Sequence, residues 1–244
     1  MNGLLILLQT TTHAGNVGSA IYWIVFIGLM ILSGIVSRQV QSKFKKYSKI
    51  AMNYGMTGRE VAEKMLYDND IRDVKIQMVQ GTLTDHYNPT NKTLNLSPDV
   101  YRGTSVAAAA VAAHECGHAV QHATAYRWLT MRSRMVPAVS FTSKWVSWVL
   151  LAGILLVNIF PGLLLVGIAM LAISTLFSVV TLPVEIDASK RALVWLNTHN
   201  VTSPDTHPYA ESALRSAAYT YVVAALTSLA TLLYYVMIYL NNRN

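Results

Sequence analysis

The chain has 244 residues, of which 53% are hydrophobic and only 13% are charged. Soluble domains usually have about a quarter of their residues charged, so this composition excludes an ordinary soluble protein. The formal charge of +7 is compatible with nucleic-acid binding, but the Lys and Arg residues gather beside apolar segments. That arrangement favours membrane orientation over a nucleic-acid partner. The single cysteine excludes an intramolecular disulfide and fits a reducing compartment.

The N-terminal part contains the first predicted membrane span. The apolar run Leu4–Leu8 is short and has no basic region before it, so we expect no cleaved signal peptide. Val17–Ser37 is 21 residues without a charge, which is long enough to cross a hydrocarbon core of about 30 Å. The basic run Lys43–Lys49 follows it. We interpret this run as a flank that stops membrane transfer, with contact to anionic lipid as the alternative.

A more polar region with mixed secondary structure comes next. Thr57–Tyr67 is predicted to be a short amphipathic helix that Thr57 caps, with Glu60 three residues on. Val74–Val79 alternates apolar and polar residues as a half-buried strand does. Gly81–Asn88 and Thr93–Leu96 predict a β-hairpin. The first strand of this hairpin is either internal or an edge strand that pairs with an extended substrate.

The Ala-rich segment Thr104–Thr124 is predicted to be a helix capped by Thr104 or Ser105. It has the length of a membrane span, but its second half contains three histidines, a glutamate and a glutamine. These groups would be costly in lipid. We therefore expect a soluble helix that lies at or just above the membrane.

This helix contains the H-E-x-x-H motif, as His114-Glu-Cys-Gly-His118. Helix positions i and i+4 face the same way about 6 Å apart, so the two imidazoles can share one Zn²⁺ ion. Glu115 is rotated by about 100° from His114, beside the metal, where it can take a proton from metal-bound water. Gly117 allows a neighbouring backbone to approach closely. Cys116 should point away from the metal into the packing.

Two further apolar segments follow. Trp145–Leu182 is uncharged for 38 residues, which is too long for one span. Asn158, Pro161 and Gly162 interrupt it and predict a turn between two helices of a hairpin. Ser216–Leu240 supplies a fourth span, with tyrosines near both ends, where aromatic belts lie.

Catalytic zinc needs a third protein ligand and an open position for water. The longer motif with a third histidine is absent, because Thr124 occupies that place. Residues 183–215 contain four acids, and Glu185 is the favoured ligand because it follows the third span directly. It lies on a helix that we expect to begin at Pro183. The alternative is an N-terminal helix acid that interacts favourably with the helix dipole.

The distribution of charge predicts the topology. Eighteen of the 19 Lys and Arg residues, and all 12 acids, lie in residues 38–144 and 183–215. The positive-inside rule therefore places both regions in the cytoplasm and both termini on the other side. The expected division is residues 1–37 as N-terminal segment and first span, 38–135 as metallopeptidase domain, 136–182 as transmembrane hairpin, 183–215 as a cytoplasmic helix with the third zinc ligand, and 216–244 as fourth span and tail.

Four stretches resemble the YugP-type neutral zinc metallopeptidases, membrane-embedded relatives of the HtpX proteases and the CAAX prenyl endopeptidases; they are 81–89, 105–121, 183–192 and 217–221. The resemblance covers nearly the whole chain. It implies a zinc site of His114, His118 and Glu185 with Glu115 catalytic. In the HtpX-like relatives an aspartate follows the ligand glutamate by four residues. Here Ser189 holds that place and the nearest acid is Asp187, which leaves the partners of the histidines open.

Several other polar residues are weaker candidates. His122 repeats the i+4 spacing, but its backbone lies about 12 Å from that of His114, so we do not expect it to be a ligand. Five residues could donate to the oxyanion of the intermediate, and none is favoured: His86, His199, His207, Arg215 and Tyr219.

The sequence thus predicts an α-helical membrane protein with about four transmembrane helices and a cytoplasmic α+β zincin-like metallopeptidase domain. The expected activity is zinc-dependent endoproteolysis of membrane or membrane-proximal proteins, at a multi-pass protein of the cell membrane. Zinc would polarise the scissile carbonyl while Glu115 deprotonates the bound water. The expected partners are protein or peptide substrates and the lipid bilayer, with no nucleic acid and the oligomeric state left open. The alternatives are a catalytically silent zinc-binding scaffold or chaperone, and a transporter.

Overall fold

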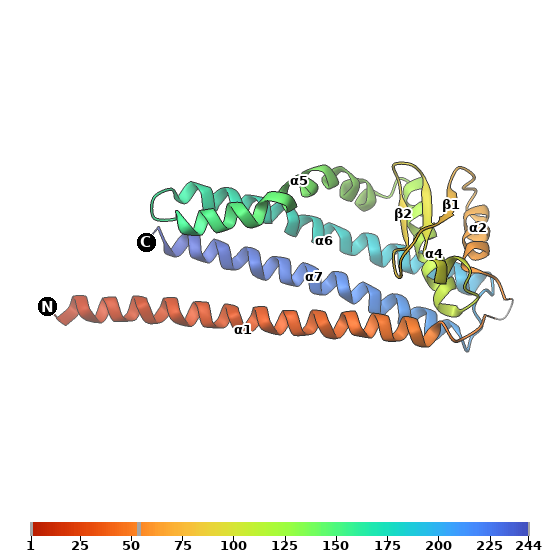
Figure 1. Cartoon of the computed structure of the whole chain (residues 1–244), viewed down its shortest axis with the longest axis horizontal. Helices are drawn as coiled ribbons and strands as arrows, with labels where there is room; N and C mark the ends of the chain where they lie inside the picture. Colours follow the sequence, from red (N-terminus) through yellow and green to blue (C-terminus); the bar gives the residue numbers. More distant parts are fainter. Residues whose placement is uncertain (1, 53–54, 244) are drawn as a thin grey trace. The chain divides into compact units, whose positions relative to one another are not determined.

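The computed structural model of the chain describes residues 2–52 and 55–243. Two compact units can be distinguished. The first comprises Met1–Ile35, Pro137–Ser178 and Val223–Asn244, and the second Val36–Val136 and Val179–Val222. The boundaries fall within long helices, and Figure 1 labels most of the elements. In chain order these are α1 (Asn2–Tyr47), α2 (Gly58–Asp68), β1 (Lys75–Met78), β2 (His86–Asn88), β3 (Thr93–Leu96), α3 (Pro98–Tyr101), α4 (Val106–Ala123), α5 (Arg127–Leu155), α6 (Pro161–Thr198) and α7 (His207–Asn241).

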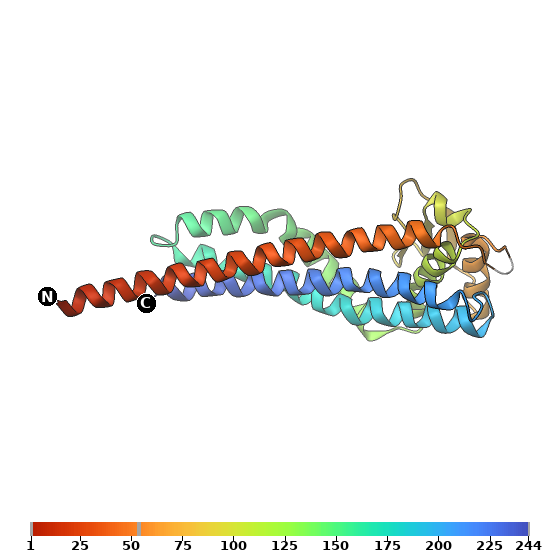
Figure 2. The same cartoon turned by 90° about the horizontal axis from the view of Figure 1, so that it is seen from below.

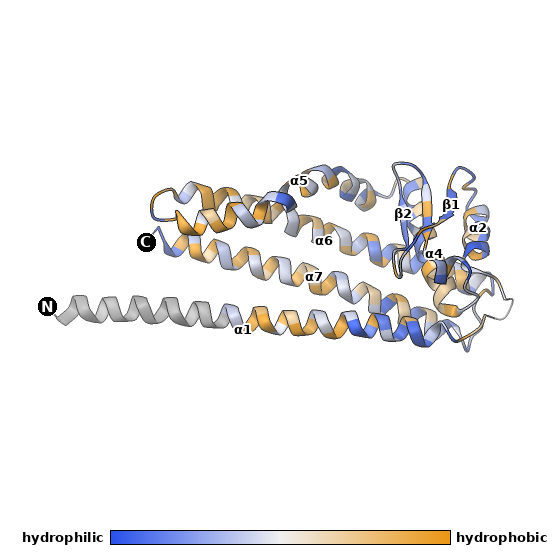
Figure 3. Ribbon diagram, in the orientation of Figure 1, coloured by the Kyte–Doolittle hydropathy of each residue, from blue (hydrophilic) through white to orange (hydrophobic). Residues whose placement is uncertain are grey.

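The chain is mostly helical, and four of the described helices are long and apolar enough to cross a membrane. The candidate spans are Tyr22–Tyr47, Arg127–Leu155, Pro161–Thr198 and His207–Asn241. Hydrophobic residues predominate along these helices, whereas the C-terminal end of α1 is mostly hydrophilic (Figure 3). Only 6% of the most apolar window of the first span is buried. Exposed apolar surface of this kind suits a lipid environment, so the structure contains the four long apolar helices that the sequence predicted as candidate spans.

The first unit contains the predicted helical hairpin. Helix α5 ends at Leu155 and α6 begins at Pro161, with a short turn between them, as Figures 1 and 2 show. Gly153 and Gly167 allow the two helices to approach closely. A Cβ atom at Gly153 would lie 2.7 Å from the Leu164 Cα, and one at Gly167 would lie 2.6 Å from a Leu150 methyl. The expected turn is therefore confirmed.

The expected helix start at Pro183 is wrong, because α6 runs through this residue without a break. Proline has the backbone angle of a helix and removes one hydrogen bond, a cost that packing can offset. Val184 and Ala188, just after it, are fully buried. Glu185 thus lies far from the N-terminus of its helix, and a favourable interaction with the helix dipole does not explain it.

The second unit contains a small mixed sheet in the order β1-β3-β2. Strand β3 is buried at every position; it pairs in parallel with β1 and antiparallel with β2. This confirms the predicted hairpin, although β2 begins at His86 and not at Gly81. The reason is that Gly81 and Leu83 have positive φ angles of 110° and 58°, which are incompatible with an extended strand.

Helix α4 is the centre of the second unit. Ser105 caps its N-terminus by accepting a hydrogen bond from the Ala108 N–H. The helix packs against α2, α3, β2 and β3, and nearly all of its residues are buried. Alanine makes this possible because its small side chain lets neighbouring elements come close on every face. The cap at Thr57 of α2 is also formed, as a capping box with Glu60.

Candidate metal centre and catalytic site

Helix α4 brings His114, Glu115 and His118 to one region of the second unit. The two imidazole rings lie 4.9 Å apart between centroids, as their i, i+4 spacing requires. Glu115 and His118 are buried, at 8% and 7% exposure. The backbone of α6 comes close to this segment at Gly117, where a Cβ atom would lie only 2.6 Å from the Ala188 carbonyl oxygen. The glycine therefore allows α6 to approach the motif.

This approach places Glu185 of α6 against both histidines. Its Oε2 atom lies 3.3 Å from Nε2 of His114 and 3.6 Å from Nε2 of His118. The ligand atoms of the three residues all lie within 4.8 Å of one another, and among the described residues only this group has such an arrangement. Three donors at about 2.0–2.1 Å from a tetrahedral zinc ion would be roughly 3.3–3.4 Å apart. The two distances from Glu185 Oε2 to the imidazole nitrogens are close to this spacing.

The surroundings of Glu185 test whether a cation fits here. Its carboxylate is almost completely buried, and Oε2 accepts no hydrogen bond from the described residues. A buried carboxylate oxygen without a donor is costly unless a cation or ligand completes it. Two imidazole nitrogens and one carboxylate oxygen are a donor set of catalytic zinc sites, and they leave a fourth position open. The residues present therefore fit zinc.

A chain of hydrogen bonds holds His118. Its Nδ1 lies 3.1 Å from the Gln121 Oε1. The Gln121 amide nitrogen donates to the Val184 carbonyl and to the Asp187 carboxylate, at 2.8 and 2.9 Å. This fixes the orientation of the amide, so its oxygen must accept from the Nδ1–H of His118. In the neutral imidazole, the lone pair of His118 is consequently on Nε2, which faces Glu185. Arg191 in turn donates to Asp187 at 2.6 Å.

His114 has a different outer partner. Its Nδ1 lies 3.1 Å from the hydroxyl of Ser189, at the position where the HtpX-like pattern has an aspartate. A hydroxyl can accept a hydrogen bond as the aspartate does, but without a negative charge.

The nearby carboxylates affect the pKa of His118. Burial by itself lowers the pKa of His118, but the carboxylates of Glu185 and Glu115 outweigh burial and raise this pKa above its usual value. These two carboxylates therefore favour a positive charge on His118.

Strand β2 holds Glu115. The backbone N–H of Tyr87 donates to the Glu115 carboxylate at 2.9 Å, which fixes this side chain beside the histidines. Strand β2 lies at the edge of the sheet, where a substrate strand could pair with it. The Tyr87 N–H, however, already donates to Glu115 and is not free for such pairing.

Asp85, just before β2, accepts hydrogen bonds from the Ser97 N–H and hydroxyl at 2.7 and 3.0 Å. Burial of Asp85 raises the pKa of its carboxyl despite these hydrogen bonds.

Two residues of this region, Arg132 and Tyr221, were not among those predicted from the sequence. Arg132 of α5 lies 3.4 Å from Oε1 of Glu185. Tyr221 of α7 also interacts with Glu185 and lines a cavity of about 140 Å³ together with His114 and Glu115. Tyr221 lies in one of the stretches that carry the family resemblance, which was the signal that could have identified it. Arg132 is one of several basic residues after α4, and its spacing gave no signal.

The weaker candidates lie elsewhere or have other partners. His122 contacts the Tyr87 hydroxyl through Nδ1 at 2.8 Å and is not in the ligand group. Cys116 is fully buried and faces the Ala62 carbonyl, as expected. The remaining five do not line the 140 Å³ cavity: His86, His199, His207, Arg215 and Tyr219.

Comparison with known proteins identifies the family. The family described as "Putative neutral zinc metallopeptidase" matches residues 22–240. The chain belongs to this family. The chain is also 41% identical over 206 residues to the "Putative membrane protease YugP" of Bacillus subtilis (strain 168), over 84% of this chain and 91% of that protein. No solved structure gives a significant match.

Membership of the zinc metallopeptidase family confirms the resemblance that the sequence motifs indicated. The family implies zinc, and the group of His114, His118 and Glu185 is a possible site for it. The similarity to a membrane protease agrees with the four helices that are able to span a bilayer.

Proposed function

We propose that the protein is a membrane-embedded zinc endopeptidase in which His114, His118 and Glu185 hold the metal and Glu115 is the general base. The observation that carries the proposal is the buried Oε2 of Glu185, which faces two imidazole Nε2 atoms and receives no hydrogen bond from the described residues. An ordinary ion-paired core carboxylate would have donors on both oxygens. A structural metal site, moreover, has no need of a second carboxylate, Glu115, beside the ligands.

The mechanism assigns each residue a step in peptide hydrolysis. Bound zinc supplies Lewis acidity, which polarises a carbonyl and lowers the pKa of water. Glu115 takes the proton from the attacking water and then gives it to the leaving amine. The Tyr87 N–H keeps the Glu115 carboxylate in place for both transfers, and it leaves the other carboxylate oxygen available.

Tyr221 and Arg132 have separate roles in this proposal. The phenol of Tyr221 lines the cavity of about 140 Å³ beside His114 and Glu115, which we refer to as the catalytic cavity. It can donate a hydrogen bond to the oxyanion that develops on the scissile carbonyl. Arg132 pairs with Oε1 of Glu185, the oxygen that does not face the histidines, and so holds the carboxylate in a single orientation. Tyr221 therefore acts on the substrate, whereas Arg132 acts through the ligand.

We further propose that the substrates are membrane or membrane-proximal proteins and that the site faces the cytoplasm. Glu185 lies three residues beyond the uncharged segment that ends at Leu182, about 4.5 Å along a helix. A site so close to the end of a span reaches peptide bonds near the bilayer surface. In this scheme residues 38–135 and 183–215 form the cytoplasmic peptidase, and residues 1–37, 136–182 and 216–244 contain the membrane spans.

Reporter fusions test the sidedness. Fusions at Gln77 and Ser203 should both report the cytoplasm, and a fusion after Asn244 should report the opposite side, because 18 of 19 basic residues lie in the two regions probed first. An extracytoplasmic signal at Gln77 would refute the orientation and the location of the site together.

The Glu115→Gln substitution tests the catalytic role. Glutamine preserves the size of the side chain but removes the basic oxygen, so the purified variant should keep its zinc while peptide turnover falls by about 10²–10⁴-fold. Metal content and turnover are measured on the same sample, and Glu185→Ala serves as a control that should lose zinc. Full zinc with near-normal turnover would exclude Glu115 as the general base. Loss of zinc from Glu115→Gln would show that this residue supports the metal site itself.

A further inference from the structure

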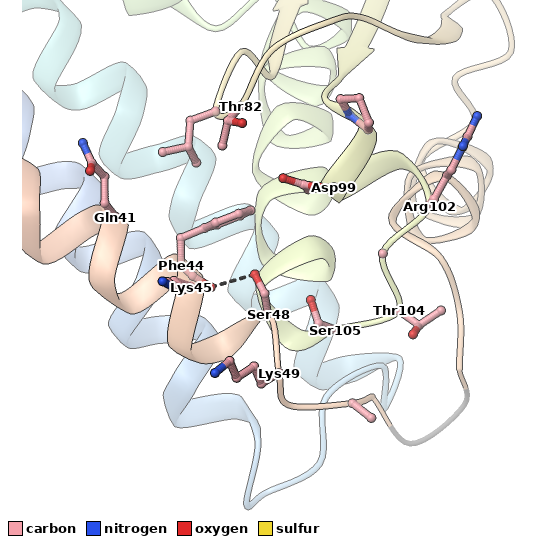
Figure 4. A pocket seen from close by; sticks show the side chains of 14 residues that line it. Gln41, Phe44, Lys45, Ser48, Lys49, Thr82, Asp99, Arg102, Thr104 and Ser105 are labelled. Atoms are coloured by element: carbon pink, nitrogen blue, oxygen red, sulfur yellow. Dashed lines mark hydrogen bonds between the residues drawn. The ribbon is translucent and has the colours of Figure 1, made fainter.

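A large open cavity lies in the second unit, apart from the metal ligands. It has a volume of about 1170 Å³. Figure 4 shows the side chains that line it. One wall is formed by Gln41, Phe44 and Lys45 at the C-terminal end of α1, and by Ser48 and Lys49 in the turn that follows. The opposite wall consists of the loop at residues 82–83 and the segment 98–105. We refer to the space between these walls as the basic cavity.

The charge of this lining is positive. Lys45, Lys49 and Arg102 contribute three cations and Asp99 one carboxylate, which gives a net charge of +2. Among the described residues no acidic side chain forms an ion pair with any of the three cations. Other basic residues have partners within the protein; Lys64, for example, pairs with Asp68 at 2.9 Å. The basic cavity therefore presents cations that are available to an acidic ligand.

The basic cavity adjoins the catalytic cavity at one residue. Leu83 lines both of them. It has a φ angle of 58°, a conformation that is sparsely populated for a branched apolar side chain. Residues held in such conformations often lie at functional sites. Here the strained backbone places Leu83 at the junction between the two spaces.

The sizes of the two cavities determine what the basic cavity could hold. The catalytic cavity, at about 140 Å³, has room for little more than the residues at a scissile bond. A peptide substrate must continue beyond it, and the large cavity next to Leu83 is lined by polar side chains from three segments. We propose that the basic cavity binds an acidic segment of the substrate peptide that flanks the scissile bond. This inference rests on the proposed peptidase function and specifies its substrate class.

The geometry of α1 supplies a matched control. Lys46 lies on the same helix between two cavity residues, is also exposed, and does not line the cavity. A charge reversal there changes the net charge of the protein as much as a reversal at Lys45 does. Any difference between the two variants therefore reports the cavity and not the general charge of the surface.

The test measures peptide binding, so that it does not depend on hydrolysis. Zinc-loaded Glu115→Gln protein in neutral-lipid nanodiscs is titrated with fluorescent twelve-residue peptides that share a central sequence and have acidic, neutral or basic flanks. We expect the acidic peptide to bind at least about tenfold more tightly than the neutral one at low salt, and this preference to fall as salt screens the charges. The single reversal Lys45→Glu should weaken the preference, whereas the charge-matched Lys46→Glu should retain it. The double reversal Lys45→Glu with Lys49→Glu should abolish the preference.

Equal binding of acidic and neutral peptides, or no binding of any peptide, would overturn the inference, as would an equal loss of the preference in Lys46→Glu. Thermal unfolding and zinc content confirm that each variant is folded, and Arg102→Glu provides an independent reversal from the opposite wall. Nanodiscs that contain anionic lipid form a second arm. If the double reversal changes the amount of anionic lipid retained but leaves peptide affinity unchanged, the cavity binds lipid and the inference is wrong. Failure of wild-type protein to hydrolyse peptides would instead count against the proposed function.

Discussion

The close contact between α4 and α6 at Gly117 leads to a prediction about the metal centre. In Gly117→Ala, the new Cβ atom would lie 2.6 Å from the Ala188 carbonyl oxygen and 3.0 Å from the Ala188 Cα. Both are backbone atoms, so rotation of a side chain cannot relieve the contact. Ordinary van der Waals contact begins at about 3.4 Å, so the two helices would have to separate by about 0.8 Å.

Two opposing effects set the change in stability. Overpacking a buried contact costs roughly 1–3 kcal/mol. Replacing glycine by alanine inside a helix favours the folded state by roughly 0.5–1 kcal/mol. We therefore expect a net loss of about 0–2.5 kcal/mol in the free energy of unfolding. The effect on the metal should be larger, because a shift of about 0.8 Å exceeds the tolerance of about 0.2 Å for metal–ligand distances.

Zinc affinity, measured by competition with a chelator, should therefore fall in Gly117→Ala by more than the loss of stability alone predicts. Thermal unfolding of metal-free protein measures the stability change separately. Gly28→Ala is the matched control, since it makes the same substitution in a helix where no atom lies within 4 Å of the new Cβ. Wild-type zinc affinity in Gly117→Ala would refute the idea that this contact positions Glu185 against the histidines.

Two further predictions concern groups around the site. Gln121→Leu removes the acceptor for the His118 Nδ1–H, so zinc affinity should fall about 10–100-fold, while His122→Ala should leave it unchanged; equal affinities in both variants would contradict the role of Gln121. Asp85→Asn tests the raised pKa of Asp85 in metal-free protein. Because the folded state binds this proton more tightly than the unfolded state, wild-type stability should decline as pH rises from about 4 through the raised pKa, and the variant should lack this part of the decline. Identical pH profiles of unfolding would show that Asp85 does not titrate in this way.

Local patterns in the sequence determined much of this protein. The 21-residue uncharged run, the interrupted apolar stretch and the tyrosine-flanked segment indicated four spans, because spanning a bilayer depends on the length and polarity of one segment alone. The capping box at Thr57 was likewise readable from residues three positions apart. Within α4, the i, i+4 spacing was sufficient to predict that His114 and His118 share a face.

Only the tertiary structure determines which residues contact the face of α4 that contains His114 and His118. Gln121, Ser189, Arg132 and Tyr221 surround the candidate site, and three of these four lie on helices other than α4. No local periodicity encodes such contacts, which depend on how closely two helices approach and on the register between them. The sequence also suggested a helix start at Pro183, whereas packing of the following residues keeps α6 continuous. A residue's local preference is worth at most a few kcal/mol, and the burial of a whole helix face can outweigh it.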